Sequence, residues 1–417
     1  VDGDDAVFGT ETNSTLINKG QISASGVGSA GVVFFGAGGV IRNSGEILSA
    51  ESHAVAIFST SGETLVTNLK GGIIASPRSQ AALVGDNGNE TIVNAGRIGA
   101  VDATFGIFLT VDLGAGDDHF TNFKKIGNKV VSGALLGFAD LGDGNDTFLG
   151  ARKKEAVIDG GGSDTYKLGG GGDTYIAKNG GSDGNDIVSG GSGIDTFDVG
   201  GSVFNGVSIN IDNKDHSFGM AFVPANTARG DDISGGINTD TITGFEHVGG
   251  GESNDIIFGN KAANVVFANS GADGVVGFGG NDYLIGGLGA DFLIGGKGAD
   301  RLDGQEDADT FAFVSVKDST PAKAGRDVIL DFEDALDIIN LDAIDANARN
   351  GVATNEEFQF LGVDVAFASG AGGLRVATKD FGWIIQGEVN GDKKADFAIK
   401  VLDASHTISW SGGDFDL

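Results

Sequence analysis

The chain lacks cysteine altogether and has little proline, methionine, tryptophan or tyrosine. Its 417 residues include 0 Cys, 3 Pro, 1 Met, 2 Trp and 3 Tyr. The absence of cysteine excludes a disulfide framework, a cysteine nucleophile and a thiolate metal site. Oxygen atoms are therefore the only abundant ligands that this chain offers to a metal ion.

Basic residues are also scarce. Lys and Arg number 27 against 58 Asp and Glu, which gives a formal net charge of -31. This balance argues against a nucleic-acid partner and against anionic membrane surfaces, because both need dense basic footprints. No run approaches the ~18 apolar residues of a membrane-spanning helix, and the first residues show no signal-peptide pattern. We therefore expect a protein that neither spans a membrane nor binds nucleic acid.

Glycine and phenylalanine, in contrast, are plentiful. The chain has 74 Gly and 28 Phe, and 40% of its residues are hydrophobic. Glycine occurs at more than twice its usual frequency of about 7%, so a repeated backbone requirement must account for it. The apolar content is high enough for a core, so the composition predicts a folded chain rather than a disordered one.

The first half contains a repeat of about 25 residues. The runs TLINKGQISA, VIRNSGEILSA, LVTNLKGGIIA and TIVNAGRIGA align on Asn18, Asn43, Asn68 and Asn94. Each is followed by an apolar run, namely AGVVFF, HAVAIF, QAALV or TFGIFL, and a looser copy surrounds Asn122. Short apolar runs separated by Gly, Asn and Ser at a constant period predict stacked β-coils, as in a parallel β-helix. The Asn side chains should then line up at one turn and hydrogen-bond one another.

A second repeat is nine residues long and runs in register through seven copies from 250 to 312. Its sixth position is Asp255, Asn264, Asp273, Asp282, Asp291, Asp300 and Asp309, and its eighth position is always apolar. An earlier array from 141 shows the same pattern at Asp146, Glu155, Asp164, Asp173, Asp186 and Asp195, and a single copy surrounds Asp118.

These nonapeptides follow the pattern G-G-x-G-x-D-x-U-x and resemble the calcium-binding repeats of the repeats-in-toxin (RTX) proteins. The segment from about 245 to 417, including DTFAFVSVKDSTPAKAGRDVILDFEDALDIINLDAID and QGEVNGDKKADFAIKVLD, also resembles the C-terminal region of the serralysin proteases. The resemblance implies a β-roll in which each nonapeptide makes half a coil, so that alternate copies stack and share Ca²⁺ ions. Position 6 would supply carboxylates, position 8 would fill the core, and glycines with positive φ would turn carbonyl oxygens towards the ions.

The resemblance assigns two kinds of calcium ligand. The carboxylates are Asp118, Asp146, Asp164, Asp173, Asp186, Asp195, Asp255, Asp273, Asp282, Asp291, Asp300 and Asp309. The turn glycines are Gly277, Gly279, Gly286, Gly289, Gly295 and Gly298. Asp255, Asp273, Asp291 and Asp309 should form one ladder, and Asn264, Asp282 and Asp300 the other. We expect weak or absent ion binding at Asn264, at Glu155 and in GQEDADTFA, and a largely unfolded chain without calcium.

The predicted fold is all-β: a right-handed parallel β-helix that continues into a calcium-binding parallel β-roll, with a mixed β-rich C-terminal cap. We divide the chain into a β-helix at 1–140, a first RTX array at 141–198, a bridging segment at 199–249, a second RTX array at 250–312, and a serralysin-like cap at 313–417. The terminal DFDL resembles the signal read by the type I secretion apparatus, which implies a secreted protein that folds in extracellular calcium.

No catalytic site is evident in the sequence. The five histidines are scattered and there is no HExxH, so the protease activity is not carried over from the resemblance. Asp117, Asp118 and His119, near Lys124 and Lys125, are the best constellation, but they also fit a nonapeptide turn. A second calcium candidate, Glu388, Asn390, Asp392 and Asp396, has alternating acidic spacing, and a plain β-turn explains it equally well.

Three functions remain open at this stage. The first is a non-catalytic extracellular structural or adhesive protein, such as a surface-layer, matrix or filament subunit. Its partners would be calcium and either other copies of itself or an extracellular polysaccharide. The second is a carbohydrate-active β-helix enzyme of the polysaccharide lyase or epimerase type. It would require a Lys or Arg, an Asp pair and a His to converge in a groove of residues 1–140. The third is the accessory part of a longer toxin or protease.

Overall fold

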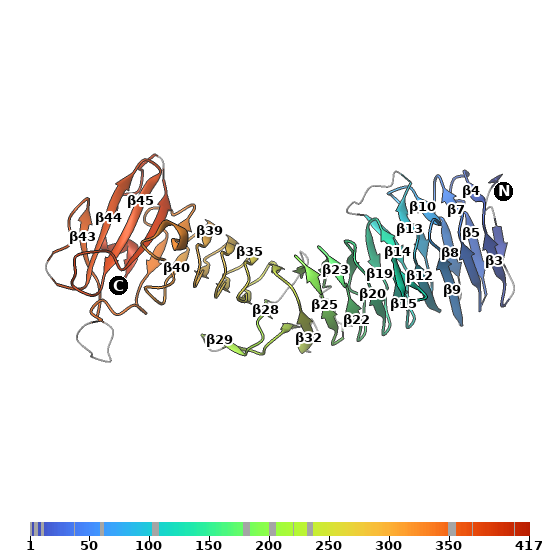
Figure 1. Ribbon diagram of the computed structural model, residues 1–417, viewed down its shortest axis with the longest axis horizontal. Helices are drawn as coiled ribbons and strands as arrows, with labels where there is room; N and C mark the ends of the chain where they lie inside the picture. The colour runs from blue at the N-terminus through green and yellow to red at the C-terminus, as the bar shows by residue number, and fades with distance from the viewer. Residues whose placement is uncertain are drawn as a thin grey trace. The chain divides into compact units, whose positions relative to one another are not determined.

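The computed structural model describes residues 2–3, 7–9, 12–36, 38–58, 62–101, 108–177, 184–199, 206–219, 221–231, 237–348, 356–368, 370–403 and 405–417. The chain divides into two compact units, Val1–Val199 with Asp232–Phe245, and Gly200–Asp231 with Glu246–Leu417 (Figure 1). The start of the predicted strand TFGIFL and parts of the bridging segment lie outside the described residues. Among the described residues, no helix is long and apolar enough to cross a membrane.

The first unit is built from three parallel sheets, in which each strand pairs with its equivalent one coil away. Sheet A contains β1 (Asp2–Gly3), β4 (Gln21–Ala24), β7 (Glu46–Ser49), β10 (Ile73–Ser76), β13 (Arg97–Ala100) and β18 (Ala134–Leu135). Sheet B contains β2 (Val7–Gly9), β5 (Val32–Phe35), β8 (Val55–Phe58), β11 (Leu83–Val84), β14 (Leu109–Asp112), β19 (Phe138–Asp140), β21 (Ala156–Ile158), β24 (Thr174–Ile176) and β27 (Thr196–Asp198). Sheet C contains β3 (Thr15–Asn18), β6 (Val40–Asn43), β9 (Glu63–Asn68), β12 (Asn89–Asn94), β15 (His119–Thr121), β20 (Thr147–Leu149), β22 (Thr165–Lys167), β25 (Ile187–Ser189) and β32 (Ile237–Thr243).

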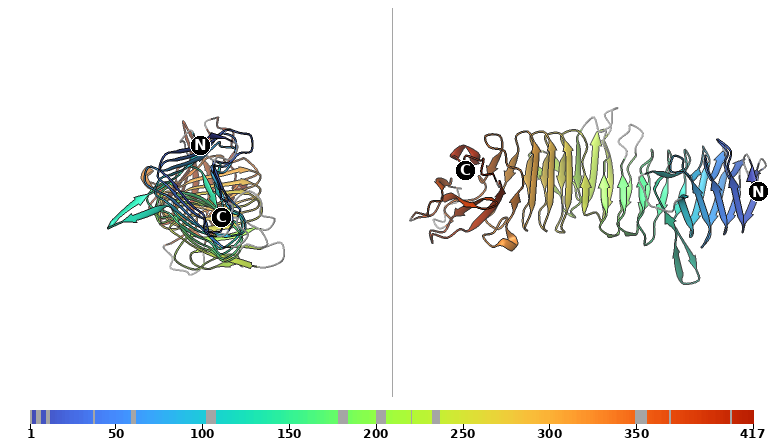
Figure 2. Two further views of the ribbon diagram at one scale, coloured as in Figure 1. Left: turned by 90° about the vertical axis from the view of Figure 1, so that its right-hand side faces the viewer. Right: turned by 90° about the horizontal axis from the view of Figure 1, so that it is seen from above.

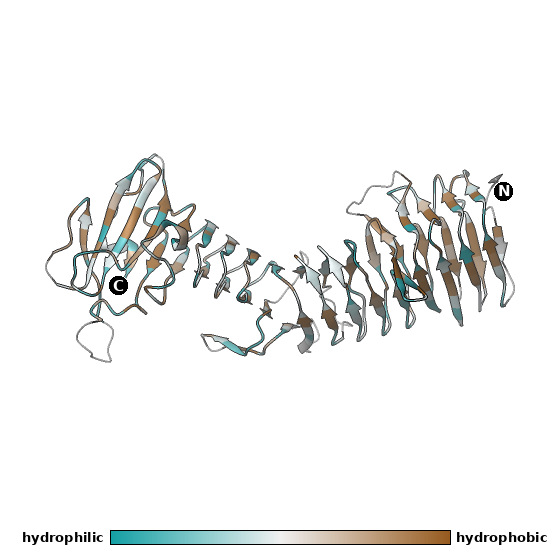
Figure 3. Ribbon diagram, in the orientation of Figure 1, coloured by the Kyte–Doolittle hydropathy of each residue, from teal (hydrophilic) through white to brown (hydrophobic). Residues whose placement is uncertain are grey.

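Two smaller pairs complete the first unit. The strands β23 (Gly170–Gly171) and β26 (Ser192–Gly193) pair in parallel within the nonapeptide turns. The strands β16 (Phe123–Ile126) and β17 (Lys129–Ser132) form an antiparallel hairpin that projects from the stacked coils (Figure 2). Apolar residues concentrate along the strands of this unit and polar ones at its turns (Figure 3), as expected for coils that enclose a core.

Sheets B and C continue without a break from the 25-residue coils into the first nonapeptide array, whereas sheet A ends at β18. The reason is coil length. Thr15 pairs with Val40, 25 residues on, whereas Thr147 pairs with Thr165, only 18 residues on. At about 3.3 Å per residue, the shorter coil has room for two strands and two turns but not for a third strand. The predicted continuation of a β-helix into a β-roll is confirmed.

The second unit contains two main sheets, which we call D and E. Sheet D runs β33 (His247–Gly249), β35 (Val265–Ser270), β37 (Tyr283–Leu288), β39 (Arg301–Glu306), β41 (Val328–Ile329), β46 (Phe397–Leu402), β45 (Gly382–Glu388), β44 (Gly373–Lys379) and β43 (Gln359–Val363). Sheet E runs β31 (Thr227–Asp231), β28 (Val207–Asn210), β34 (Ile256–Phe258), β36 (Gly274–Val276), β38 (Phe292–Ile294), β40 (Thr310–Ala312), β42 (Ile338–Asn340) and β47 (Phe415–Asp416). Two 3₁₀ turns, η1 (Lys323–Gly325) and η2 (Gly412–Asp414), lie in the cap.

The eighth position of the nonapeptides forms the core of both arrays, as predicted. The side chains at this position are fully buried in every copy from Phe148 to Phe197 and from Ile257 to Phe311. Rings stack on one another from coil to coil, for example Phe120 on Phe148 with centroids 5.3 Å apart. Their burial supplies the apolar contribution to stability, while the turns carry the polar groups.

The described part of the bridging segment contributes β32 to the first unit, and β28, β31, β33 and a covering hairpin to the second. Strand β28 extends sheet E, and the hairpin of β29 (His216–Phe218) and β30 (Ala221–Val223) packs on the outer side of that sheet. Phe218 lies against Gly274, where a Cβ atom would come within 2.6 Å of its ring. The described part of this segment therefore has a structural role, because it covers apolar side chains such as Phe258.

The asparagines of the 25-residue repeat form the predicted ladder. The Asn18 amide donates to Asn43 (2.8 Å), Asn43 to Asn68 (3.0 Å), Asn68 to Asn94 (3.0 Å) and Asn94 to Asn122 (2.8 Å). The same amides donate to backbone carbonyls, as Asn68 does to Arg97 at 3.1 Å. All five side chains are buried, so each amide must find its partners within the protein.

Replacing Asn68 by Ala should lower the free energy of unfolding of the first unit by roughly 2–4 kcal/mol. The substitution removes the hydrogen bonds that the Asn68 side chain makes to Asn43, Asn94 and the Arg97 carbonyl, each worth about 0.5–1.5 kcal/mol. The Asn43 amide keeps only its bond to the Ile73 carbonyl, and the Asn94 carbonyl keeps only the Gly96 N–H. Denaturant unfolding in saturating calcium would measure this change. The exposed turn residue Lys70 is the control, since Lys70→Ala should change stability by less than ~0.5 kcal/mol.

Candidate calcium-binding turns

The position-6 carboxylates of the second unit form the two predicted ladders. In the first, each Oδ1 accepts the backbone N–H of the equivalent residue one coil earlier, and the distances are 2.7 Å for Asp255 to Asp273, 2.8 Å for Asp273 to Asp291, and 2.9 Å for Asp291 to Asp309. In the second, the distances are 2.8 Å for Asn264 to Asp282 and 2.8 Å for Asp282 to Asp300. The cap continues both ladders through Asp337 and Asp327.

The first unit has the same arrangement. One ladder runs through Glu90, Asp118, Asp146, Asp164, Asp186 and Asp240, with N–H to Oδ1 distances between 2.5 and 3.0 Å. The other runs through Glu155, Asp173 and Asp195. Glu155 Oε1 also accepts the last amide of the Asn ladder, from Asn122 at 3.0 Å. The neutral Asn ladder and an acidic ladder are thus one continuous hydrogen-bonded line.

The two oxygens of each carboxylate have different environments. Oδ1 holds the neighbouring coil, whereas Oδ2 is buried and accepts no hydrogen bond at Asp118, Asp146, Asp173, Asp273, Asp282, Asp291, Asp300 and Asp309. The other predicted ligands differ, because Asp164 and Asp186 accept tyrosine hydroxyls and Asp255 accepts the Gly251 N–H. A buried carboxylate oxygen without a donor is stabilised by a proton or by a cation, and hard oxygen ligands in irregular turns suit Ca²⁺.

The predicted glycines serve two distinct purposes. At Gly277, Gly286 and Gly295 a Cβ atom would lie 2.4, 2.1 and 2.5 Å from the Oδ2 of the Asp in the same nonapeptide, so these positions are small to admit the carboxylate. Gly289 (φ 113°) and Gly298 (φ 155°) are left-handed, as expected.

The prediction of a positive φ was wrong for Gly277, Gly279, Gly286 and Gly295, none of which lies in the left-handed region. In the nonapeptide that contains Gly279, the left-handed residues are Phe278 (φ 71°) and Gly280 (φ 129°). A Cβ atom at Gly279 would meet only the Lys297 carbonyl oxygen, at 3.7 Å, so neither space nor φ demands glycine there.

Burial raises the pKa values of the ladder carboxyls well above their ordinary range. The pKa rises to about 8 for Asp282, about 7 for Asp273 and Asp309, and about 6 for Asp291 and Asp300. The backbone N–H bonds oppose this rise, and for Asp282 the charge of Asp300 adds to it. The turns therefore bind protons when no cation balances their charge.

The calcium-free chain should consequently be more stable at pH 5.5 than at pH 8. A carboxyl whose folded pKa lies above its unfolded value of ~3.9 stabilises the fold fully below that value and loses this contribution as pH rises through the folded pKa, here about 6–8. Circular dichroism of the protein in chelator, measured across this pH range, would show the gain of β-structure on acidification. Calcium affinity should change in the opposite sense, with protons released on binding at pH 7. If the protein in chelator is no more folded at pH 5.5 than at pH 8, this expectation is wrong.

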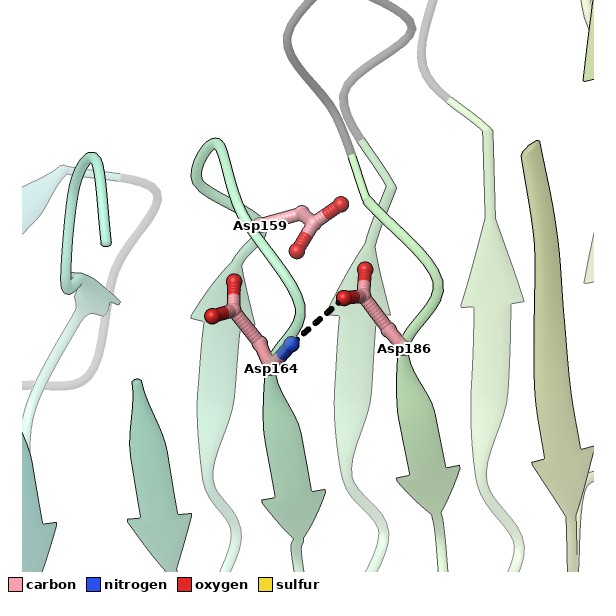
Figure 4. A group of neighbouring side chains, drawn as sticks. All are labelled: Asp159, Asp164 and Asp186. Carbon is pink, nitrogen blue, oxygen red and sulfur yellow. Dashed lines mark hydrogen bonds between the residues drawn. The ribbon is translucent and has the colours of Figure 1, made fainter. Parts of the chain in front are cut away.

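An additional acidic group lies inside the first array. Asp159, Asp164 and Asp186 are all buried and offer one carboxylate oxygen each within 4.8 Å of one another (Figure 4). Asp159 occupies the first position of its nonapeptide, where most copies have Gly. Tyr166 and Tyr175 donate their hydroxyls to Asp164 and Asp186, at 3.0 and 3.3 Å. This turn is therefore more acidic and more hydrogen-bonded than the other copies.

Sequence reasoning missed several members of the ladders, although their nonapeptides are visible. Glu90 lies in GDNGNETIV (85–93) and Asp240 in GGINTDTIT (235–243), and both runs keep most of the pattern. Position 5 was also overlooked. The Asn145 N–H donates to Asp117 Oδ1 (2.9 Å), and the Ser163 N–H donates to Asn145 Oδ1 (3.1 Å), so this position forms an outer ladder.

The other residues considered in the sequence make hydrogen bonds within the fold. Asp118 points into the coil, whereas the adjacent His119 bonds Thr121 at 3.0 Å, so the constellation considered for catalysis does not converge. Asn264 donates its amide to the Glu246 carbonyl at 2.9 Å. Asp309 of GQEDADTFA is buried in register with the regular copies. In the loop at 388–396, Glu388 Oε1 accepts the N–H groups of Asn390 and Asp392, both at 3.0 Å, which closes the loop on itself.

Comparisons with known proteins agree with this geometry. Residues 180–202, 249–277 and 276–311 match the family described as RTX calcium-binding nonapeptide repeat (4 copies). No curated protein matches this chain.

Three solved structures are similar to parts of the chain. The AlgE6R3 subunit of the Azotobacter vinelandii mannuronan C5-epimerase is 26% identical with a TM-score of 0.20, over 39% of this chain and 78% of that one. The AlgE6R2 subunit of the same enzyme is 23% identical (TM-score 0.22), over 39% and 88%. The extracellular lipase LipA of Serratia marcescens is 18% identical (TM-score 0.23), over 67% of this chain and 41% of the lipase. The family match and the strand pairing show that the chain carries RTX calcium-binding nonapeptide repeats, set within an all-β parallel solenoid.

Proposed function

We propose that this protein is secreted, folds on binding Ca²⁺, and acts outside the cell as a non-catalytic structural or adhesive component that assembles with copies of itself. The observation that carries this proposal is the set of buried ladder carboxylates, each with one oxygen on the neighbouring coil and, in most turns, a second oxygen without a donor. Once their carboxyls are ionised, such turns need cations to balance the charge, and millimolar calcium is an extracellular condition.

The coil-to-coil arrangement supports a structural role. Strands in both units are committed to parallel stacks, and the ladders tie each coil to the next. Stacked coils expose unpaired strand edges at their ends, which are templates for association. The DFDL run that resembles a type I signal contains β47, where Phe415 is 7% exposed and packs against Trp410 with centroids 5.5 Å apart. A secretion apparatus reading this run would have to meet the chain before it folds.

Light scattering and negative-stain microscopy of the purified protein test the assembly. We expect monomers in chelator and ordered assemblies in millimolar calcium, with magnesium as the control that does not restore assembly. A calcium-loaded chain that stays monomeric at high protein concentration would contradict the structural role while leaving calcium-dependent folding intact.

One observation favours the alternative of a carbohydrate-active enzyme. A groove of about 330 Å³ in the first unit is lined by His53, Arg78, Phe108 and Asp112 among others. His53 Nδ1 lies 2.8 Å from the Ala81 carbonyl, which can only accept, so a neutral His53 keeps the lone pair of Nε2 for use as a base. Arg78 lies over the Phe108 ring at 5.1 Å and lines the same groove as His53. The groove contains a His, an Arg and an acid, but a single Asp rather than the pair that we anticipated.

A panel of acidic polysaccharides tests this alternative. A lyase would give unsaturated products that absorb ultraviolet light. His53→Ala should abolish the formation of these products, whereas His119→Ala should not. No product from any polymer with the calcium-loaded protein would exclude the lyase reaction on those polymers.

A further inference from the structure

Six basic residues of the second unit gather on one side of sheet D and its cap. This basic face consists of Arg301, Lys323, Arg326, Arg375, Lys379 and Lys400. Strand register brings them together, because Arg301 pairs with Val328, Val328 with Lys400, and Lys400 with Ile384. Residues at paired positions of a sheet project to the same side, so the row crosses four adjacent strands.

A groove of about 320 Å³ lies within the basic face, lined by Arg326, Arg375 and Lys379. The Arg375 guanidinium is held in place by Gln386 (2.9 and 3.1 Å) and by the Val365 carbonyl (3.0 Å), and it stacks on Phe367 at 4.2 Å. The Arg326 Nε–H is buried and has no acceptor. The groove thus offers one fixed guanidinium and one buried donor that lacks a partner.

The cations of the basic face are close enough to repel one another. Burial and the charges of Lys323, Arg301 and Arg326 lower the pKa of Lys400. The nearby carboxylates already have partners, since Asp364 accepts from Thr378 (2.7 and 2.9 Å) and Asp303 accepts the Tyr283 hydroxyl (2.9 Å). A ligand carrying several negative charges would therefore relieve a repulsion that the fold leaves in place.

We propose that the basic face docks on the acidic turn edge of a second copy of this chain, formed by Asp86, Asp117 and Asp143 of its first unit. In that edge Ala115 bonds the Asp86 carbonyl and pairs with Asp143, so the acidic residues lie on consecutive coils, and Asp117 and Asp143 are exposed. With a net charge of -31, two copies repel each other over most of their surfaces, so attraction between them requires a basic patch such as this one. The inference rests on the proposed self-assembly and names its interface. Because different patches meet, the contact is heterologous and can propagate.

Charge reversal tests the interface at residues other than the ladder carboxylates. Lys323→Glu with Lys379→Glu changes two exposed cations of the basic face, and Asp86→Lys with Asp143→Lys changes the acidic edge. Each double variant should raise the protein concentration needed for assembly in millimolar calcium by about tenfold or more, as measured by light scattering. An equimolar mixture of the two double variants should assemble again, because the reversed face of one meets the reversed edge of the other.

The matched control is Lys19→Glu with Lys70→Glu, which makes the same charge change at exposed turns of the first unit. This control should assemble like the wild type, and calcium-induced circular dichroism should be unchanged in all variants. Assembly that is insensitive to both double variants would overturn the interface but leave the proposed function standing. Loss of binding to an acidic polysaccharide, with assembly unchanged, would overturn it in favour of a polymer ligand. A monomeric wild type would overturn both proposals.

Discussion

Removal of calcium should unfold the nonapeptide turns of both units while the Asn-ladder coils of the first unit remain folded. Carboxylates on successive coils are about 4.8 Å apart, so each unbalanced neighbouring pair costs ~0.9 kcal/mol in water and about 3.5 kcal/mol at an effective dielectric of 20. A few such pairs offset the typical 5–15 kcal/mol stability of a domain. The coils from Thr15 to Asn94 are instead joined by neutral amides, which need no cation.

Hydrogen exchange monitored by mass spectrometry measures this difference segment by segment. In chelator, we expect protection to be lost across 250–312 and the array that contains Asp164, and to be retained in strands β6 to β10. Limited proteolysis should yield a chelator-resistant fragment from the first half of the chain. Readdition of Ca²⁺, but not of Mg²⁺, should restore protection. If the Asn-ladder coils lose as much protection as the nonapeptides, the coils do not fold independently of calcium. If protection is unchanged everywhere, the turns do not need calcium to fold.

The substitution Asp291→Asn should stabilise the calcium-free protein and weaken its response to calcium. An Asn side chain retains an oxygen that can accept the Asp273 N–H, now 2.8 Å from Oδ1, but it removes the negative charge between Asp273 and Asp309. We expect the free energy of unfolding in chelator to rise by ~1–3 kcal/mol. The affinity of the folded turns for calcium should fall about tenfold, which corresponds to about 1.4 kcal/mol and is measured by calorimetry.

Asn264 allows the opposite substitution to be tested. Asn264→Asp introduces a carboxylate next to Asp282 and removes the amide that donates to the Glu246 carbonyl at 2.9 Å. This variant should be less stable in chelator and should bind calcium more tightly or in greater number, as calorimetry would measure. Asp380→Asn is the matched control, because Asp380 is exposed and lies outside the ladders. If Asp291→Asn lowers stability in chelator as well as in calcium, the carboxylate is a hydrogen-bonding group rather than a ligand.

Much of the solenoid could be predicted from the repeats alone. Equivalent positions of a constant repeat must stack, so the buried eighth position, the Asn ladder and the two acidic ladders of the second unit were all predictable from spacing. Positions that keep the spacing but change the residue were harder to recognise. Glu90 and Asp240 were missed because Glu replaces Asp in one and the glycines are fewer in the other.

What the sequence determined by itself is the period, and with it the all-β stacked fold, the inward and outward positions, and the carboxylate at each turn. Only the tertiary structure decided which carboxylate oxygen accepts the backbone N–H of the neighbouring coil and which is left without a donor. The same structure decided that Gly286 must be small rather than left-handed, and that Glu155 joins the Asn ladder to an acidic one. It also decided that Arg301, Arg326 and Lys400 meet on one face. These features depend on side-chain direction and on contacts between residues far apart in the chain, and a linear repeat specifies which residues stack but not which atoms then face one another.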